Sequence, residues 1–224
     1  MFQNLQKTGG LAALAMAAAF IIAFVVFLGV LMPAGYFEEG ILAADKVKII
    51  ADNSTMVTIG YLIPYVGWGF LLVALALALY DRLKDSVPVL ARLATAFGLI
   101  WAVIIIASGL VAVHGIRTVT ELHAADPSLA ASVWVTVETV FNGLGGEAGE
   151  VIGGTWLLLT GWAGLRSAKI PKALSYLTLG LGVVGIITVV PLFEPVLAIF
   201  GIGLIVWFIW TGVHMLRNSH GMTT

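Results

Sequence analysis

The chain has 224 residues, of which 60% are hydrophobic and only 10% are charged, whereas soluble domains carry about 25% charged residues. This composition excludes a soluble globule. The net charge of −1, with scattered basic residues, gives no electrostatic footprint for nucleic acid. Cysteine is absent, which excludes disulfides, iron–sulfur clusters and thiolate zinc sites.

Six stretches are almost free of charge and long enough to cross a bilayer, because about 20 apolar residues at ~1.5 Å per residue span ~30 Å of hydrocarbon. They cover residues 11–32, 57–80, 93–113, 144–165, 173–190 and 195–216. Each run is continuously apolar, which is typical of helices and not of alternating membrane strands. We therefore predict an all-α integral membrane protein, a single six-transmembrane-helix bundle over residues 1–224.

The basic residues predict the orientation of the bundle. Eight Lys and Arg fall on one side of the predicted spans and three on the other; the eight are Lys7, Arg82, Lys84, Arg92, Arg166, Lys169, Lys172 and Arg217. Because basic residues are enriched in cytoplasmic loops, this bias predicts that both termini are cytoplasmic. The expected location is the cell's inner membrane, with the lipid bilayer as the principal partner.

Two outer segments carry further predicted structure. Residues 33–56 place Phe37, Ile41 and Ala44 at helical spacing beside charged residues, which is typical of a helix lying on the outer membrane surface. Residues 114–143 read as helix, turn, helix, because Asp126 and Pro127 supply an N-cap and a first helical position. We expect a protruding outer helical hairpin there.

The fourth span carries two carboxylates, Glu147 and Glu150, among six glycines. On a continuous helix both glutamates fall on the glycine-bearing face, and the spacing-four stripe of Gly145, Gly149 and Gly153 predicts close packing against a neighbouring helix. A charge within the hydrocarbon costs roughly 2.5–3.5 kcal/mol, so each glutamate requires water, a partner or protonation. These side chains are predicted to point into the bundle.

Counting from the cytoplasmic ends places several polar and aromatic side chains at one depth, in the outer leaflet. The predicted ligand-binding set, centred on Glu150, comprises Glu150, Glu147, His114, Tyr65, Tyr61, Trp68 and Asn142. For the tyrosines and Trp68, membrane-belt and core packing is the alternative, since these residues are enriched in any membrane protein. His114 lacks the clustered histidines of a catalytic zinc site, so the metal signal is weak.

The order of the spans, the turns Tyr80–Lys84 and Ile170–Lys172, and the glycine-bearing fourth span together resemble a bacterial family of small multi-pass membrane proteins. That family is catalogued as a domain of unknown function, and the resemblance covers most of residues 8–217. It implies a six-helix fold in a bacterial inner membrane. It carries over no catalytic residue.

Three functions follow as hypotheses. The first is a receptor, sensor or transporter-like protein whose outward-facing polar pocket binds a small ligand or cation at Glu150. The second is a structural or accessory subunit that joins a homo-oligomer or a larger membrane complex through its glycine-rich helix faces. The third is a membrane-embedded metal-dependent hydrolase, with Glu150 as base and His114 as ligand. Because no catalytic motif accompanies these residues, we favour the non-enzymatic functions.

Overall fold

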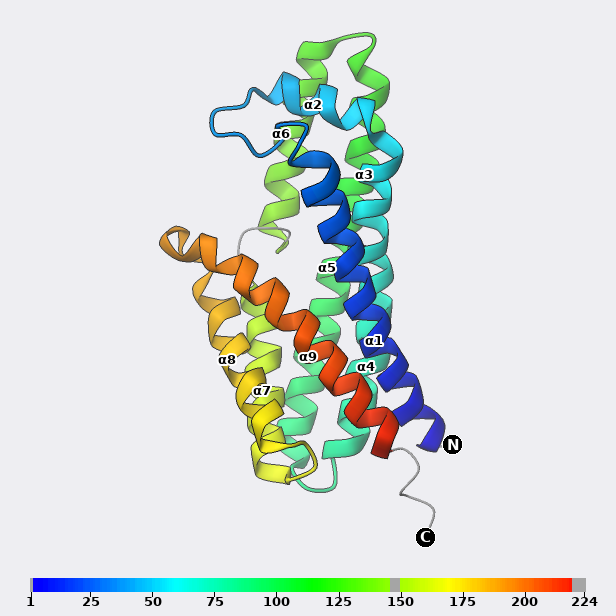
Figure 1. The fold of residues 1–224 in the computed structure, drawn as a ribbon, viewed down its shortest axis with the longest axis vertical. Helices are drawn as coiled ribbons and strands as arrows, with labels where there is room; N and C mark the ends of the chain where they lie inside the picture. Colours follow the sequence, from blue (N-terminus) through cyan, green and yellow to red (C-terminus); the bar gives the residue numbers. More distant parts are fainter. Residues whose placement is uncertain (1, 146–149, 219–224) are drawn as a thin grey trace. The chain divides into compact units, whose positions relative to one another are not determined.

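The computed structural model describes residues 2–145 and 150–218, and this part of the chain is helical without strands. The all-α class is therefore confirmed for the described residues. Figure 1 shows the helices, which are α1 (Phe2–Val26), α2 (Ala43–Asp52), α3 (Ser54–Tyr61), α4 (Trp68–Leu83), α5 (Pro88–His123), α6 (Pro127–Gly143), α7 (Val151–Ser167), α8 (Lys172–Ile187) and α9 (Leu197–Asn218). π-Helical turns η1 (Phe27–Leu31) and η2 (Leu62–Gly67) extend α1 and join α3 to α4, and the 3-10 helix η3 (Pro191–Val196) precedes α9.

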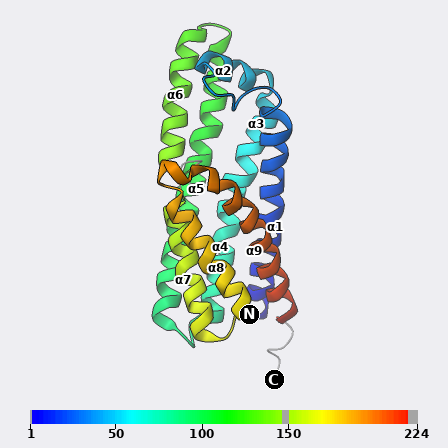
Figure 2. The ribbon, with the colours of Figure 1, turned by 60° about the vertical axis from the view of Figure 1, so that its left-hand side comes forward.

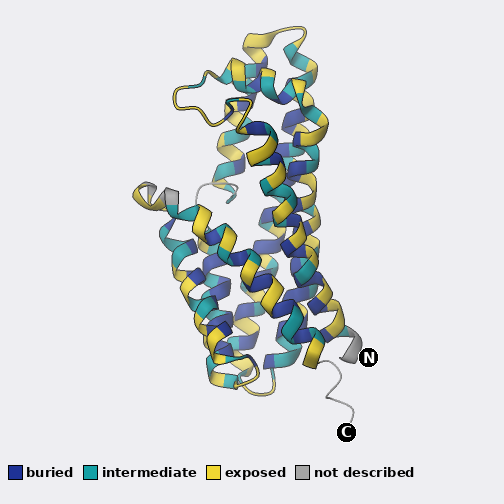
Figure 3. Cartoon of the chain, in the orientation of Figure 1, coloured by how far each residue is buried: buried dark blue, intermediate teal, exposed yellow. Residues whose placement is uncertain are grey.

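Four helical segments are long and apolar enough to cross a membrane, namely Leu5–Leu31, Ser54–Leu83, Pro88–His123 and Leu197–Asn218. They coincide with the first, second, third and sixth predicted spans. The other two predicted spans correspond to α7 and α8, which have 17 and 16 residues. Phe70 of α4, Val103 of α5 and Ile199 of α9 are large apolar side chains that are exposed, as expected of surfaces that contact lipid. Figure 3 shows exposed positions along the lengths of the helices.

The helices form two compact units. Unit 1 comprises Met1–Ala18, Trp68–Val103 and Ala148–Thr224, and unit 2 comprises Ala19–Gly67 and Ile104–Glu147. In unit 2, α2 packs against α6, and its buried core includes Val47, Ile50 and Trp134. In unit 1, α7 and α8 form the most extensive helix contact, and both views show them side by side (Figures 1 and 2).

A helix, a turn and a second helix lie within residues 114–143, and local signals set the turn. Helix α5 ends at His123, and the Asp126 side chain accepts a hydrogen bond from the Leu129 amide at 3.0 Å, with Pro127 at the start of α6. The helix predicted within residues 33–56 is shorter than expected. It begins at Ala43, because Gly35 and Gly40 have positive φ angles of 86° and 78° that interrupt a helix before it.

The fourth predicted span differs from the structure at its beginning. Helix α6 ends at Gly143, Gly145 has a φ of 92°, and α7 begins only at Val151, with Glu150 as its N-cap residue. A glycine with positive φ commonly ends a helix, because it adopts the left-handed conformation without a steric penalty. The face predicted from a continuous helix over residues 144–165 therefore applies only from Val151 onward.

Glycines do bring two helices of unit 1 close together, at positions other than the predicted stripe. A Cβ atom added at Gly154 of α7 would lie 2.7 Å from the Gly182 carbonyl oxygen of α8, and one at Gly182 would lie 2.8 Å from the Gly154 carbonyl oxygen. Of the predicted stripe, Gly145 precedes α7, Gly149 lies outside the described residues and Gly153 faces the Trp101 ring. The absence of side chains at Gly154 and Gly182 permits the α7–α8 contact.

The same substitution should have opposite effects on the two faces of this helix pair. Gly154→Ala should destabilise the protein by about 1–3 kcal/mol, because the added methyl group meets backbone atoms that have no room to retreat. Gly180→Ala in α8 should be neutral or stabilise by up to about 1 kcal/mol, because nothing lies within 4 Å of its Cβ position. Unfolding in mixed micelles of increasing denaturing detergent measures both, and equal stabilities would contradict the close contact.

Candidate functional site

The structure divides the predicted ligand-binding residues between the two units. Unit 1 contains Glu150 and Trp68, and unit 2 contains Tyr61, Tyr65, His114 and Asn142. Glu147 lies outside the described residues. Each unit therefore offers its own candidate site, and the two are described in turn.

In unit 2, Tyr61 and Tyr65 stack on one another with ring centroids 5.6 Å apart. Both contact the ring of Phe141 from α6, at 5.2 and 5.1 Å. Tyr61 is buried in the core of the unit, Asn142 is half-buried beside Phe141, and the side chain of His114 is exposed on α5. The structure thus brings the two tyrosines together, and the geometry around Tyr61 is that of core packing.

Unit 2 also holds a polar network that the sequence reasoning missed. The Glu138 carboxylate of α6 accepts hydrogen bonds at Oε1 from the Lys46 ammonium at 2.8 Å and from the Tyr36 hydroxyl at 3.1 Å. The Trp134 indole N–H in turn donates to the Tyr36 hydroxyl at 3.1 Å, and the Lys46 Nζ lies 5.0 Å from the Tyr36 ring centroid. The available signal was that Glu138 is the one charged residue within α6.

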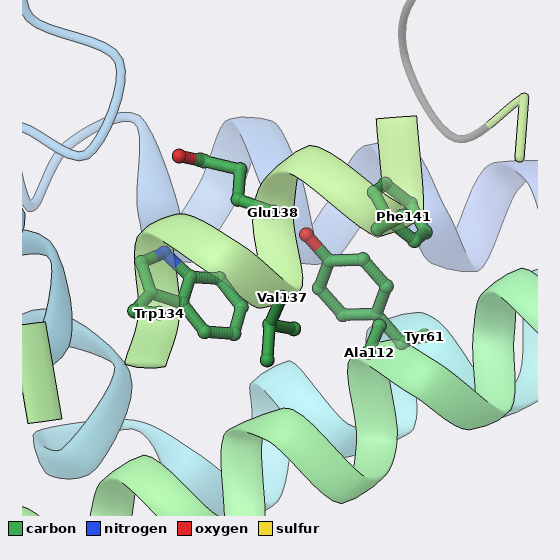
Figure 4. Close-up of a pocket in the computed structure, with 6 residues that line it drawn as sticks. All are labelled: Tyr61, Ala112, Trp134, Val137, Glu138 and Phe141. Carbon is green, nitrogen blue, oxygen red and sulfur yellow. The ribbon is translucent and has the colours of Figure 1, made fainter. Parts of the chain in front are cut away.

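A small cavity lies beside this network (Figure 4). Its volume is about 10 Å³, which is room for one water-sized occupant. Tyr61 of α3 and Ala112 of α5 face Trp134, Val137 and Phe141 of α6, while the Glu138 carboxylate points away from the Tyr61 and Phe141 rings. The Glu138 carboxylate beside this cavity is already paired with the Lys46 ammonium, which also lies over the Tyr36 ring. A carboxylate and an aromatic ring together bind a cation here, and that cation is the protein's own Lys46.

In unit 1, Glu150 lies at the N-terminus of α7 and is half-buried. Its Oε2 accepts a hydrogen bond from the Trp101 indole N–H at 2.9 Å. Its backbone N–H donates to the Gly185 carbonyl at 3.2 Å and contacts the Thr188 hydroxyl at 3.4 Å, which ties the start of α7 to the end of α8. No described basic side chain forms an ion pair with this carboxylate.

The partner of Glu150 belongs to a closed ring of five aromatic side chains. Trp68, Trp101, Trp156, Trp207 and Phe208 contact one another in that order, at centroid distances of 4.8, 5.5, 5.5 and 5.0 Å, and Phe208 returns to Trp68 at 5.7 Å. The predicted binding residue Trp68 is thus buried in this ring. Four helices, α4, α5, α7 and α9, contribute to it, so the ring holds the Trp101 donor in a fixed position against Glu150.

Comparison with known proteins gives one family. Residues 8–218 match the model of the family described as "Domain of unknown function (DUF4386)". The chain belongs to this family. No curated protein and no solved structure matches the chain. The resemblance drawn from the turns and the glycine-bearing span is thereby confirmed at the level of a family of unknown function.

The described residues of this DUF4386 protein contain no group of three His, Asp or Glu side chains that converge on one point. His114 in particular stands alone on an exposed face of α5. What the described geometry offers is two carboxylates with different partners. Glu138 is neutralised by Lys46, and Glu150 is held by a neutral indole.

Glu138→Gln should destabilise this DUF4386 protein by more than about 1 kcal/mol, because its ion pair with Lys46 is largely shielded and shares the Tyr36 hydroxyl. Glu121→Gln is the matched control, since the Arg117–Glu121 pair of the same unit is 74% and 65% exposed, and such pairs contribute at most about 1 kcal/mol. Detergent-induced unfolding measures both variants. A Glu138→Gln protein as stable as the control would show that the network contributes nothing to folding.

Proposed function

We propose that this protein is a six-span protein of a bacterial inner membrane, with both termini in the cytoplasm. Four helical segments have the length and composition of membrane spans. Helix α7, with 17 residues, is about 26 Å long, close to the ~27–30 Å thickness of a bilayer's hydrocarbon core, and α8 is apolar and one residue shorter. The eight-to-three distribution of Lys and Arg supports the orientation.

Within that bilayer the protein binds a small cation, or a ligand that carries a cationic group, at Glu150. The observation that carries this proposal is the environment of the carboxylate, which accepts one hydrogen bond from a neutral indole and pairs with no described cation. A carboxylate removed from water requires compensation by a cation or a proton. Glu138 is a weaker candidate, because Lys46 already supplies its positive charge.

The described hydrogen-bond partners of Glu150 are neutral. The Trp101 indole presents its N–H edge to the carboxylate, and its ring packs against Trp68 and Trp156, so the carboxylate itself is the group that would hold a cation. Glu147, three residues before Glu150 in the sequence, is a second candidate carboxylate for the same cation. A receptor, a sensor and a transporter all use such a site.

The accessory-subunit hypothesis is the second candidate, and the glycine contacts weigh against its simplest form. Gly154, Gly161 and Gly164 of α7 face α8 or the turn before it within unit 1. These glycine faces are therefore occupied within one chain and are unavailable to a neighbouring subunit. Under this hypothesis Glu150 serves only to accept the Trp101 hydrogen bond, which glutamine also accepts.

Carbodiimide labelling separates the two functions. N,N′-Dicyclohexylcarbodiimide reacts with carboxyl groups in apolar surroundings, and peptide mass spectrometry of protein in lipid nanodiscs would locate the adduct. We expect labelling at Glu150, lost in Glu150→Gln and retained in Glu138→Gln. We further expect one member of a cation series (lithium, sodium, potassium, ammonium, tetramethylammonium, calcium) to slow the labelling by about tenfold at saturation, since a bound cation occupies the carboxylate.

The opposite result is equally clear. If Glu150 is labelled at a rate that no cation changes, and Glu150→Gln folds with unaltered stability, the carboxylate is a hydrogen-bonding group of the helix interface. The structural hypothesis would then replace the binding hypothesis. The Glu138→Gln control ensures that a change in labelling is not a general effect of removing a buried carboxylate.

A further inference from the structure

Unit 1 contains a second polar site, which none of the sequence patterns indicated. A cavity of about 10 Å³ lies between α4, α7, α8 and α9, beside the turn that joins α7 to α8. Polar side chains from all four helices line it, together with apolar ones; the polar set is Arg82, Thr160, Thr178, Trp207, Thr211 and His214. Trp207 of the aromatic ring is among its lining residues, and none of the lining residues forms a described hydrogen bond with Glu150.

Two hydroxyl groups in this cavity lack hydrogen-bond partners. Thr160 and Thr211 are 2% and 3% exposed, and the Oγ1 atom of each is buried without a partner. A helical threonine ordinarily bonds the carbonyl of the preceding turn, as Thr178 does with Leu174 at 2.6 Å and Thr155 does with Val151 at 2.8 Å. A buried hydroxyl without a hydrogen-bond partner destabilises the folded protein, so a bound occupant is expected where two such groups line one cavity.

The charge of the cavity indicates the sign of that occupant. The Arg82 guanidinium donates from Nε to the Gln6 side-chain oxygen at 2.9 Å and from Nη1 to the Lys169 carbonyl at 3.3 Å, and Nη1 lies 3.2 Å from His214 Nε2. The Gln6 and Lys169 oxygens are neutral acceptors, and the third partner is the titratable His214 ring. Arg82 is half-buried and has no described carboxylate beside it, so a negative ion in the cavity would balance the part of its charge that is shielded from water.

Gln6 fixes the guanidinium in place. Its side chain is fully buried, and its Nε2 donates to the Ala78 carbonyl of α4 at 2.8 Å. Its oxygen is thereby oriented toward Arg82 Nε. Because both ends of this amide are engaged, Arg82 is held at the cavity and does not extend freely into the solvent.

We propose that this cavity binds a single monatomic anion of the chloride class, held by the hydroxyl groups of Thr160 and Thr211 and balanced by Arg82. The lining offers hydroxyl and guanidinium donors, which can bind an anion, and it includes no carboxylate that would repel one. The volume accommodates one water-sized particle. Polyatomic anions such as phosphate or sulfate exceed this room, so the size limits an anionic occupant to a monatomic ion.

This site is independent of the cation proposal but connected to it by the aromatic ring. Trp207 lines the anion cavity and donates to Thr178 at 2.6 Å, and its ring contacts Trp156, which contacts Trp101. Trp101 is the hydrogen-bond donor to Glu150. Unit 1 therefore has a site for each sign of charge, joined by three packed indole rings.

Thermal unfolding in lipid nanodiscs tests the anion site, with sodium chloride replacing sodium gluconate at constant sodium concentration. We expect the wild-type midpoint, measured by calorimetry, to rise saturably with chloride by about 2–4 °C. The double variant Thr160→Val, Thr211→Val should lose this rise, because it keeps the shape of both side chains and removes both hydroxyl groups. Thr155→Val is the control and should retain it, since its hydroxyl bonds within α7.

Two results would overturn the proposal. One is a wild-type unfolding midpoint that does not respond to chloride. If the double valine variant is then also more stable than wild type, the two hydroxyl groups are unsatisfied in the folded protein. The other is a chloride response that persists in the double variant, which would place the ion elsewhere. Should the double variant fail to fold, crystals of the wild type soaked in bromide decide. An anomalous peak between Thr160 Oγ1 and Thr211 Oγ1 supports the site, and water alone at that position refutes it.

Discussion

Unit 1 depends on the close approach of α7 and α8 at Gly154 and Gly182, where each helix presents a carbonyl oxygen to the space that a side chain would occupy. Several features follow from this contact. It brings the backbone N–H of Glu150 to the end of α8 at Gly185, which positions the carboxylate at the start of α7. About two turns after Gly154 and one turn before Gly182, it sets Thr160 of α7 and Thr178 of α8 on the same cavity. A wider helix separation would disperse both polar sites.

Much of the architecture was accessible from the sequence, because its determinants are local. Hydrophobic runs of about 20 residues identify membrane spans regardless of what surrounds them. The hairpin between α5 and α6 follows from Asp126 and Pro127, whose capping geometry depends on residues within three positions. The family assignment likewise rested on the order of spans and short turns, and the match over residues 8–218 confirms it.

The rest was inaccessible for identifiable reasons. Glycines in the segment before Val151 are compatible both with a packing stripe and with a helix end, and only the left-handed Gly145 decides for the latter. The Glu138–Lys46 pair joins residues separated by 92 positions, and no local pattern encodes that pairing. The cavity beside Thr160 and Thr211 depends on side-chain rotamers in which neither hydroxyl group bonds a carbonyl of its own helix, and tertiary packing determines those rotamers.

The aromatic ring of unit 1 has a spectroscopic consequence. Four of the protein's seven tryptophans lie in that ring, and the centroids of neighbouring indole rings are 4.8 to 5.5 Å apart. At such separations the electronic transitions of the rings couple, so this cluster is expected to contribute to the near-ultraviolet circular dichroism of the protein. Trp101 touches Glu150, and Trp207 lines the opposite cavity. The unmodified protein thus carries an intrinsic optical reporter on both of its polar sites, with no label introduced.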